Sequence, residues 1–223
     1  MKAILEILKK KWAGYLLEIF VITISIIGAF ALDSWKENLE KARIEKNFTD
    51  RLVIDLLSDK ENLNQIIKVQ EEKSEQIIIL IDQIGLKILN DKKKLDSLFV
   101  STYHINPTFY PIVGTYNSAI AAGTMADFRN DDNLSSIITL YDTYYSRLLY
   151  NGINLDNKWF SMAEKYKLER RTKSLRPMSA PEIIELQNDL YWHLVTVDFY
   201  IVRCNETLEK IDEILNLFTI TRN

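Results

Sequence analysis

Residues 12–32 read WAGYLLEIFVITISIIGAFAL and contain one charged side chain, that of Glu18. At a helical rise of 1.5 Å per residue, these 21 residues are about 31 Å long, close to the roughly 30 Å hydrocarbon core of a bilayer. A helix of this length in the core of a water-soluble protein would carry a polar face, and this one has almost none. The stretch therefore predicts a single transmembrane helix surrounded by the lipid bilayer, which we assign to residues 13–32.

A cleaved signal peptide is the alternative reading of this N-terminal region. The start is basic, and Ala29-Phe30-Ala31 has the small-x-small form of a cleavage site. However, the apolar run exceeds the 7–15 residues usual for a signal peptide, and it contains Glu18. These two departures favour a helix that is retained.

The basic residues around the apolar run bear on its orientation. Lys9, Lys10 and Lys11 precede it, although Lys36 and other basic residues follow it closely. A run of lysines before the first span favours a cytoplasmic N-terminus, so that the bulk of the chain is periplasmic. We expect residues 1–12 to form a short basic amphipathic segment at the membrane surface.

One face of the predicted span carries small residues and the carboxyl group. Spacings of three and four residues place Gly14, Glu18, Ser25 and Ala29 on this face. Small residues allow two membrane helices to approach closely, and a carboxyl group within a span usually faces protein. We interpret the face as a contact for a second copy of the chain or for another membrane protein. The alternative is that Glu18 extends toward the head groups and contacts no protein.

The remaining sequence favours helices. The 223 residues include only 6 Gly and 4 Pro, too few for a protein rich in turns, and the net charge of −3 argues against nucleic acid as a partner. Apolar residues recur at helical spacing beyond the span, which predicts a long stalk helix within residues 33–94. Residues 95–223 would complete the bundle, giving an all-α protein in which one transmembrane helix continues into a stalk and an extramembrane helical bundle.

Local signals give approximate boundaries within residues 95–223. We expect a short helix at 95–100, an irregular stretch at 101–114, and a helix that begins after Thr115 and ends at Gly123. Further helices are predicted at about 133–150, 154–171 and 181–218. The last of these begins with a capping box formed by Ser179 and Glu182.

Several short motifs occur in an order that is familiar from one protein family. They are Ser34-Trp35, Arg51-Leu52 with Asp55-Leu56, Phe109-Tyr110-Pro111, Thr115-Tyr116, Gly123, Asn133-Leu134, Ile137, Tyr141 and Tyr144-Tyr145. Over residues 10–150 the chain resembles a family of small bacterial single-span membrane proteins of unknown function. The resemblance implies an inner-membrane location and a helical architecture, and it implies no activity.

The sequence contains no recognisable catalytic motif and suggests no catalytic, cofactor-binding or metal-binding residues. His104 and His193 are far apart in sequence, and a lone histidine is more often a structural polar group than a ligand. Cys204 falls within a predicted helix and reads as a small core residue. We therefore expect neither a cofactor nor an enzymatic function.

A cluster of tyrosines offers a candidate partner surface. It comprises Tyr116, Tyr141, Tyr144, Tyr145 and Arg147. Aromatic residues with arginine are enriched at recognition surfaces, although tyrosines at helical spacing are more often half-buried core.

Two functional hypotheses follow. The first is a membrane-anchored helical scaffold or accessory subunit of a bacterial envelope complex, acting as a homo-oligomer or with another membrane protein. The second is an extracytoplasmic sensory bundle that binds a small molecule and signals through a separate partner. A pocket among Tyr103, Phe109 and Tyr110 would favour the second.

Overall fold

A computed structural model describes residues 2–85, 92–128, 131–166 and 175–220. The elements in chain order are α1 (Lys2–Gly85), α2 (Lys92–Tyr103), α3 (Gly114–Ala121), η1 (Thr124–Asp127), α4 (Asp131–Thr139), η2 (Leu140–Tyr145), α5 (Ser146–Lys165) and α6 (Ala180–Ile220). Within the described ranges there is no strand, so the expectation of an all-α protein is confirmed.

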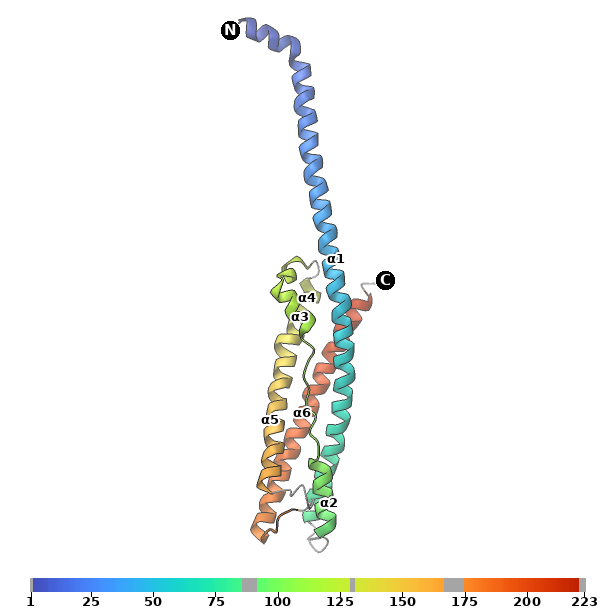
Figure 1. Cartoon of the computed structure of the whole chain (residues 1–223), viewed down its shortest axis with the longest axis vertical. Helices are drawn as coiled ribbons and strands as arrows, with labels where there is room; N and C mark the ends of the chain where they lie inside the picture. Colours follow the sequence, from blue (N-terminus) through green and yellow to red (C-terminus); the bar gives the residue numbers. More distant parts are fainter. Residues whose placement is uncertain (1, 86–91, 129–130, 167–174, 221–223) are drawn as a thin grey trace.

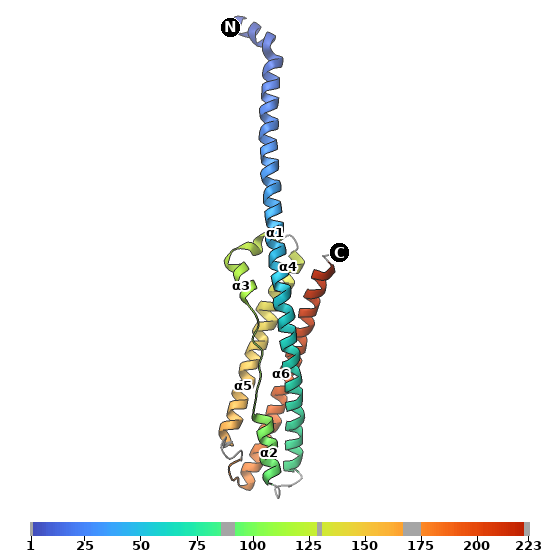
Figure 2. The same cartoon turned by 45° about the vertical axis from the view of Figure 1, so that its right-hand side comes forward.

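Helix α1 forms both the apolar segment and the stalk. Its 84 residues make a helix about 126 Å long, and its sequence contains no proline. Figures 1 and 2 show that the first half projects beyond the bundle, with its first turns bent aside, while the second half lies along α6. The described part of α1 ends at Gly85, and residues 86–91 of the expected 33–94 helix lie outside the described residues.

The apolar segment of α1 contacts no other part of the described chain. Across residues 14–40 every residue is exposed, and an 18-residue window here has a mean hydropathy of 2.3 with none of it buried. By length and composition α1 is therefore able to cross a membrane. The first buried apolar side chain of the core, that of Phe48, comes well after this segment.

The bundle is formed by the second half of α1 together with α5 and α6, and α6 packs against both of the others. Helices α1 and α6 are antiparallel, as two hydrogen bonds between their side chains show. Lys60 Nζ donates to Asp212 Oδ1, and Ser74 Oγ donates to Asp198 Oδ1 at 2.7 Å. The buried face of α6 consists of residues such as Leu190, Val197, Tyr200, Cys204, Ile211 and Ile214.

An extended segment, residues 105–113, runs along the bundle between α2 and α3. We call it the strap. Extended backbone inside a helical bundle has no helical hydrogen bonds, so its polar groups need side-chain partners. Gln70 Nε2 donates to the carbonyl of Pro107 at 2.7 Å, and Lys73 Nζ donates to that of Ile105 at 2.8 Å.

Further partners of the strap come from the other helices. The backbone N–H of Phe109 donates to the Tyr200 hydroxyl at 2.8 Å, and that of Ile112 donates to Asp59 Oδ1 at 3.1 Å. The burial of the polar groups of Asp59, Gln70, Lys73 and Tyr200 is thus explained by the irregular stretch that Pro107 and Pro111 impose.

Several expected boundaries differ from the structure. Helix α2 runs from Lys92 to Tyr103, so it is longer than the expected 95–100 helix and includes lysines of the expected 33–94 stalk. Helix α3 begins at Gly114, while Gly123 ends this region in the left-handed conformation (φ 69°), as expected of a glycine after a helix.

The expected break between residues 150 and 154 is absent, because α4, η2 and α5 follow one another without interruption from Asp131 to Lys165. Gly152 lies inside α5, where it is buried against the strap. Its role is one of close packing instead of helix termination.

Helix α6 agrees closely with its prediction of 181–218. The backbone N–H and the hydroxyl of Ser179 both donate to Glu182 Oε2 at 2.7 Å. The backbone bond has the larger effect, and together the two bonds lower the pKa of Glu182 to about 2. The backbone bond is the reciprocal half of a capping box, and it fixes the start of the helix.

Candidate functional site

The described residues contain no group of three His, Cys, Asp or Glu side chains that could hold a metal ion. His104 is exposed, with Nδ1 at 2.5 Å from the carbonyl of Ser101. His193 is fully buried, with Nδ1 at 2.7 Å from the Tyr103 hydroxyl. Burial lowers the pKa of His193 to about 3, so its ring is neutral at physiological pH.

Cys204 is also buried, and burial raises the pKa of its thiol to about 12. A thiol that stays protonated is a poor nucleophile. The buried position of Cys204 agrees with the expectation of a small core residue.

The tyrosine cluster lies mainly in the core. Tyr116 and Tyr141 stack with ring centroids 4.0 Å apart, and Tyr141 meets Tyr145 edge to face at 5.0 Å. All three are buried, Tyr144 is half-buried, and Arg147 is exposed. The candidate partner surface is therefore not a continuous exposed patch, because aromatic packing and hydrogen bonding draw its tyrosines inward.

The loop aromatics Tyr103, Phe109 and Tyr110 are divided between the core and the surface. Tyr103 and Phe109 are buried and fill the core, where Tyr103 stacks on Phe99 with centroids 4.4 Å apart. Tyr110 points outward with 67% of its surface exposed.

The face predicted on the apolar segment is exposed in full. Gly14, Glu18, Ser25 and Ala29 all lie outside the bundle. The Ser25 hydroxyl donates to the carbonyl of Val21 at 2.7 Å, which satisfies that hydroxyl within its own helix. A Cβ added at Gly14 would meet nothing within 4 Å, so the face is open to a close-packed partner.

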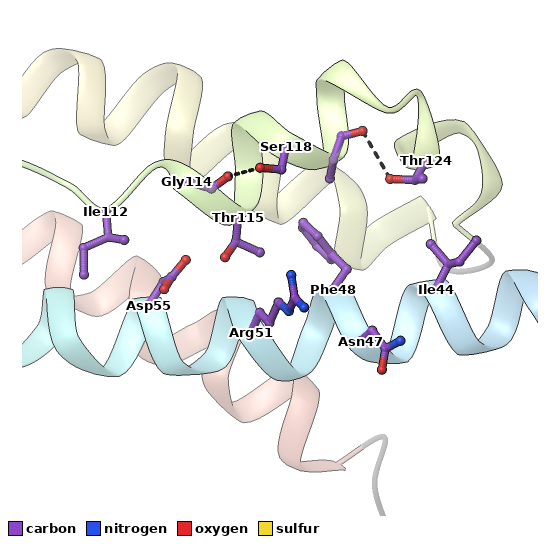
Figure 3. Close-up of a pocket in the computed structure, with 11 residues that line it drawn as sticks. Ile44, Asn47, Phe48, Arg51, Asp55, Ile112, Gly114, Thr115, Ser118 and Thr124 are labelled. Carbon is purple, nitrogen blue, oxygen red and sulfur yellow. Dashed lines mark hydrogen bonds between the residues drawn. The ribbon is translucent and has the colours of Figure 1, made fainter.

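A cavity that the sequence did not reveal lies where α1 leaves the bundle. This cavity, the α1 exit pocket, has a volume of about 550 Å³ and is open to solvent. Its lining residues are Ile44, Asn47, Phe48, Arg51 and Asp55 of α1, with Ile112, Gly114, Thr115, Ser118, Ala119 and Thr124 of the facing segment. Figure 3 shows Arg51 and Asp55 extending from α1 toward Thr115 and Ile112.

Several polar groups of the α1 exit pocket can act as acceptors. The Ser118 hydroxyl donates to the carbonyl of Gly114 at 2.7 Å, and the Thr124 hydroxyl donates to the carbonyl of Ala119 at 3.2 Å. The oxygen lone pairs of both hydroxyls therefore remain available to a ligand. Asp55 Oδ2 is buried and finds no hydrogen-bond partner among the described residues. Arg51 supplies the guanidinium donors. The pocket therefore suits a small ligand that carries both donor groups and an anionic group.

Asp59 fixes the wall behind this pocket. It lies one helical turn beyond Asp55 and is 1% exposed. It accepts hydrogen bonds from the N–H of Ile112 at 3.1 Å and from the Tyr145 hydroxyl at 2.7 Å. Burial nevertheless raises its pKa to about 6. The segment that faces α1 is thus tied to the buried carboxyl.

The pocket escaped sequence reasoning because its two walls are far apart in the chain. Arg51 and Asp55 stood out only as part of a family-like pattern, at the i, i+4 spacing that places them on one face of α1. Nothing local indicated that residues 112–124 would lie against that face.

The fold and the pocket define a class of protein, namely all-helical proteins in which one N-terminal helix, apolar at its start, carries a bundle. The chain belongs to a family described as "Family of unknown function (DUF6090)", whose model matches residues 18–201. No curated protein and no solved structure matches the chain. The match confirms membership of a family of unknown function.

Proposed function

We propose that this protein is a membrane-anchored helical scaffold or accessory subunit of a bacterial envelope complex, without enzymatic activity. The observation that carries this proposal is the apolar segment of α1, none of which is buried by its own chain. A helix that is apolar all round requires lipid or protein around it, because about 25 cal/mol is lost per Å² of apolar surface left in water. A span with an open small-residue face provides both an anchor and a contact.

The proposed topology places the N-terminus in the cytoplasm and the bundle in the periplasm, at the inner membrane. Ser97 is exposed on α2, whereas the native Cys204 is buried. In a Ser97→Cys variant, a membrane-impermeant maleimide should label the protein in intact spheroplasts and leave the wild type unlabelled. Labelling only after the spheroplasts are lysed would place the bundle in the cytoplasm and contradict this topology.

The proposed contact through α1 calls for a matched pair of variants. Glu18→Leu alters the small-residue face, while Thr23→Leu makes a similar polar-to-apolar change on the opposite side of the helix. Thr23 donates its hydroxyl hydrogen to the carbonyl of Ile19 at 2.7 Å, so its removal leaves no external partner unpaired.

The measurement is purification of each full-length variant in a gentle detergent, followed by mass determination of the eluted complex. We expect a defined oligomer or partner with the wild type and with Thr23→Leu, and its loss with Glu18→Leu. A monomer without partners in all three would contradict the scaffold proposal.

The α1 exit pocket favours a second candidate, an extracytoplasmic ligand-binding bundle. Its support is the juxtaposition of the Arg51 guanidinium with the unpartnered oxygen of Asp55 in an open cavity. A zwitterion such as a free amino acid offers the complementary ammonium and carboxylate groups.

Binding can be measured by calorimetry with a panel of free amino acids. Arg51→Gln should abolish a heat signal that Arg147→Gln, an exposed site outside the pocket, leaves intact. An absence of heat with every member of the panel would count against this candidate and leave the scaffold proposal untouched.

A further inference from the structure

Helix α6 carries large apolar side chains on its outer side as well as on its core side. Trp192 is 69% exposed, Val195 is 56%, Phe199 is 49% and Val202 is 48%. We call these four residues the outer stripe of α6. A helix of a bundle ordinarily presents polar residues to solvent, so the outer stripe needs a partner.

The outer stripe lies on a different side of α6 from the buried face. At 100° per residue, its members centre about 150° around the helix from His193, Val197 and Tyr200, which are fully buried. Helices α1 and α5 both pack against α6, and α1 reaches Asp198, at the edge of the outer stripe, through Ser74. No helix in the described part of the chain covers the outer stripe.

The bilayer cannot cover the outer stripe if α1 is the anchor. The hydrogen bond between Ser74 and Asp198 places the middle of the outer stripe level with residue 74 of α1. Residue 74 lies 42 residues beyond Leu32, which is about 63 Å along the helix. A protein surface is therefore the partner that suits the outer stripe.

A second copy of the chain fits this surface. Copies anchored in one membrane share one direction, so their α6 helices run parallel at the same height. The spacing of three, four and three residues makes Trp192 and Phe199 a positions and Val195 and Val202 d positions of a heptad. In a parallel pair each of these layers meets its own copy across a two-fold axis.

The flanking charges are complementary in this arrangement. Asp198, which also accepts a hydrogen bond from Ser74 of its own chain, occupies a g position, and Arg203 occupies the following e position. These two positions face each other across a parallel pair. Arg203 is already held beside the outer stripe, with its guanidinium 4.6 Å from the Phe199 ring and 2.5 Å from Glu206.

We infer that the outer stripe forms a parallel α6–α6 interface between two copies of this chain. The inference rests on the proposed membrane anchor, which sets the orientation. Two heptads make a short interface, which confinement of both copies to one membrane favours by raising their effective concentration.

Cysteine cross-linking of the full-length protein in native membranes tests the interface directly. Val195→Cys and Val202→Cys place thiols at d positions, which face their own copies, and both side chains are exposed so the fold is kept. Asn157→Cys on the exposed side of α5 is the matched control. Under a mild oxidant we expect a disulfide-linked dimer with both α6 variants, and monomer with Asn157→Cys and with the wild type.

A charge exchange tests the register. In the Val195→Cys background, Asp198→Arg should lower the yield of dimer because two cations then meet, and adding Arg203→Asp should restore it. Failure of the double change to restore the yield would overturn the parallel register.

Three further outcomes would contradict the α6–α6 interface. Monomer with both α6 variants, in protein that stays in the membrane fraction, would overturn the interface and leave the anchor standing. If Asn157→Cys cross-linked as strongly as the α6 variants, the disulfides would come from random collision, and the interface would be overturned as well. Release of the protein from membranes by alkaline washing would contradict the anchor itself, and with it the height and orientation on which the interface depends.

Discussion

A single carboxyl group, that of Asp59, joins three parts of the bundle. It lies on α1, accepts from the backbone of Ile112 in the strap, and accepts from Tyr145 of η2. Burial costs the ionised form more than these two bonds return, and the nearby Asp55 adds repulsion, so the pKa rises from 3.8 to about 6. The Asp59 carboxyl therefore both holds the strap and has a pKa of about 6.

This shift predicts a pH dependence of stability. Between pH 4 and pH 6 the folded state holds the proton of Asp59 while the unfolded state releases it, so the free energy of unfolding falls as pH rises through this window. Asp59→Asn removes this titration while other carboxyl groups titrate in both proteins. We expect the thermal midpoint of the wild type, minus that of Asp59→Asn, to decrease from pH 4 to pH 6. A difference that stays constant with pH would contradict the raised pKa.

The Tyr200 hydroxyl gives a second prediction at this scale. It accepts the backbone N–H of Phe109 at a buried site, so Tyr200→Phe leaves that donor unpaired. Loss of about 1–3 kcal/mol in the free energy of unfolding is expected. Tyr150→Phe, at an exposed position, should change it by less than about 0.5 kcal/mol. Denaturant unfolding followed by circular dichroism measures both, and equal effects of the two changes would speak against the hydrogen bond.

Among the elements, the strap shows what the sequence could and could not predict. Helix α6 was predictable within two residues because Pro181 and Glu182 mark its start locally. Pro107 and Pro111 likewise predicted an irregular stretch. Its course along the bundle was not predictable, because it depends on partners such as Gln70 and Tyr200, which are distant in sequence. The α1 exit pocket was missed for the same reason, since residues 112–124 form one of its walls.

At Gly152 the strap packs against α5. A Cβ added there would lie 3.4 Å from Thr108 Cβ and 3.6 Å from the Tyr200 ring, which is ordinary contact. Gly152→Ala should therefore fit and raise stability by up to about 1 kcal/mol, through better helix propensity. Gly152→Val adds methyl groups beyond that contact and should destabilise by about 1–3 kcal/mol. Denaturant unfolding of both variants provides the comparison, and a stabilising valine would show that the strap is not packed against α5 as described.

At the scale of the whole molecule, the apolar segment and the bundle are structurally independent. Residues 14–40 are all exposed, and the first buried apolar residue is Phe48. A chain of residues 34–223 therefore loses no described core contact. We expect it to remain in the aqueous fraction, to keep its helical circular dichroism, and to unfold at the thermal midpoint of the full-length protein in detergent. If the shortened chain lost its cooperative transition, the apolar segment would have to stabilise the bundle through contacts that the structure does not contain, and its role as a separate anchor would be contradicted.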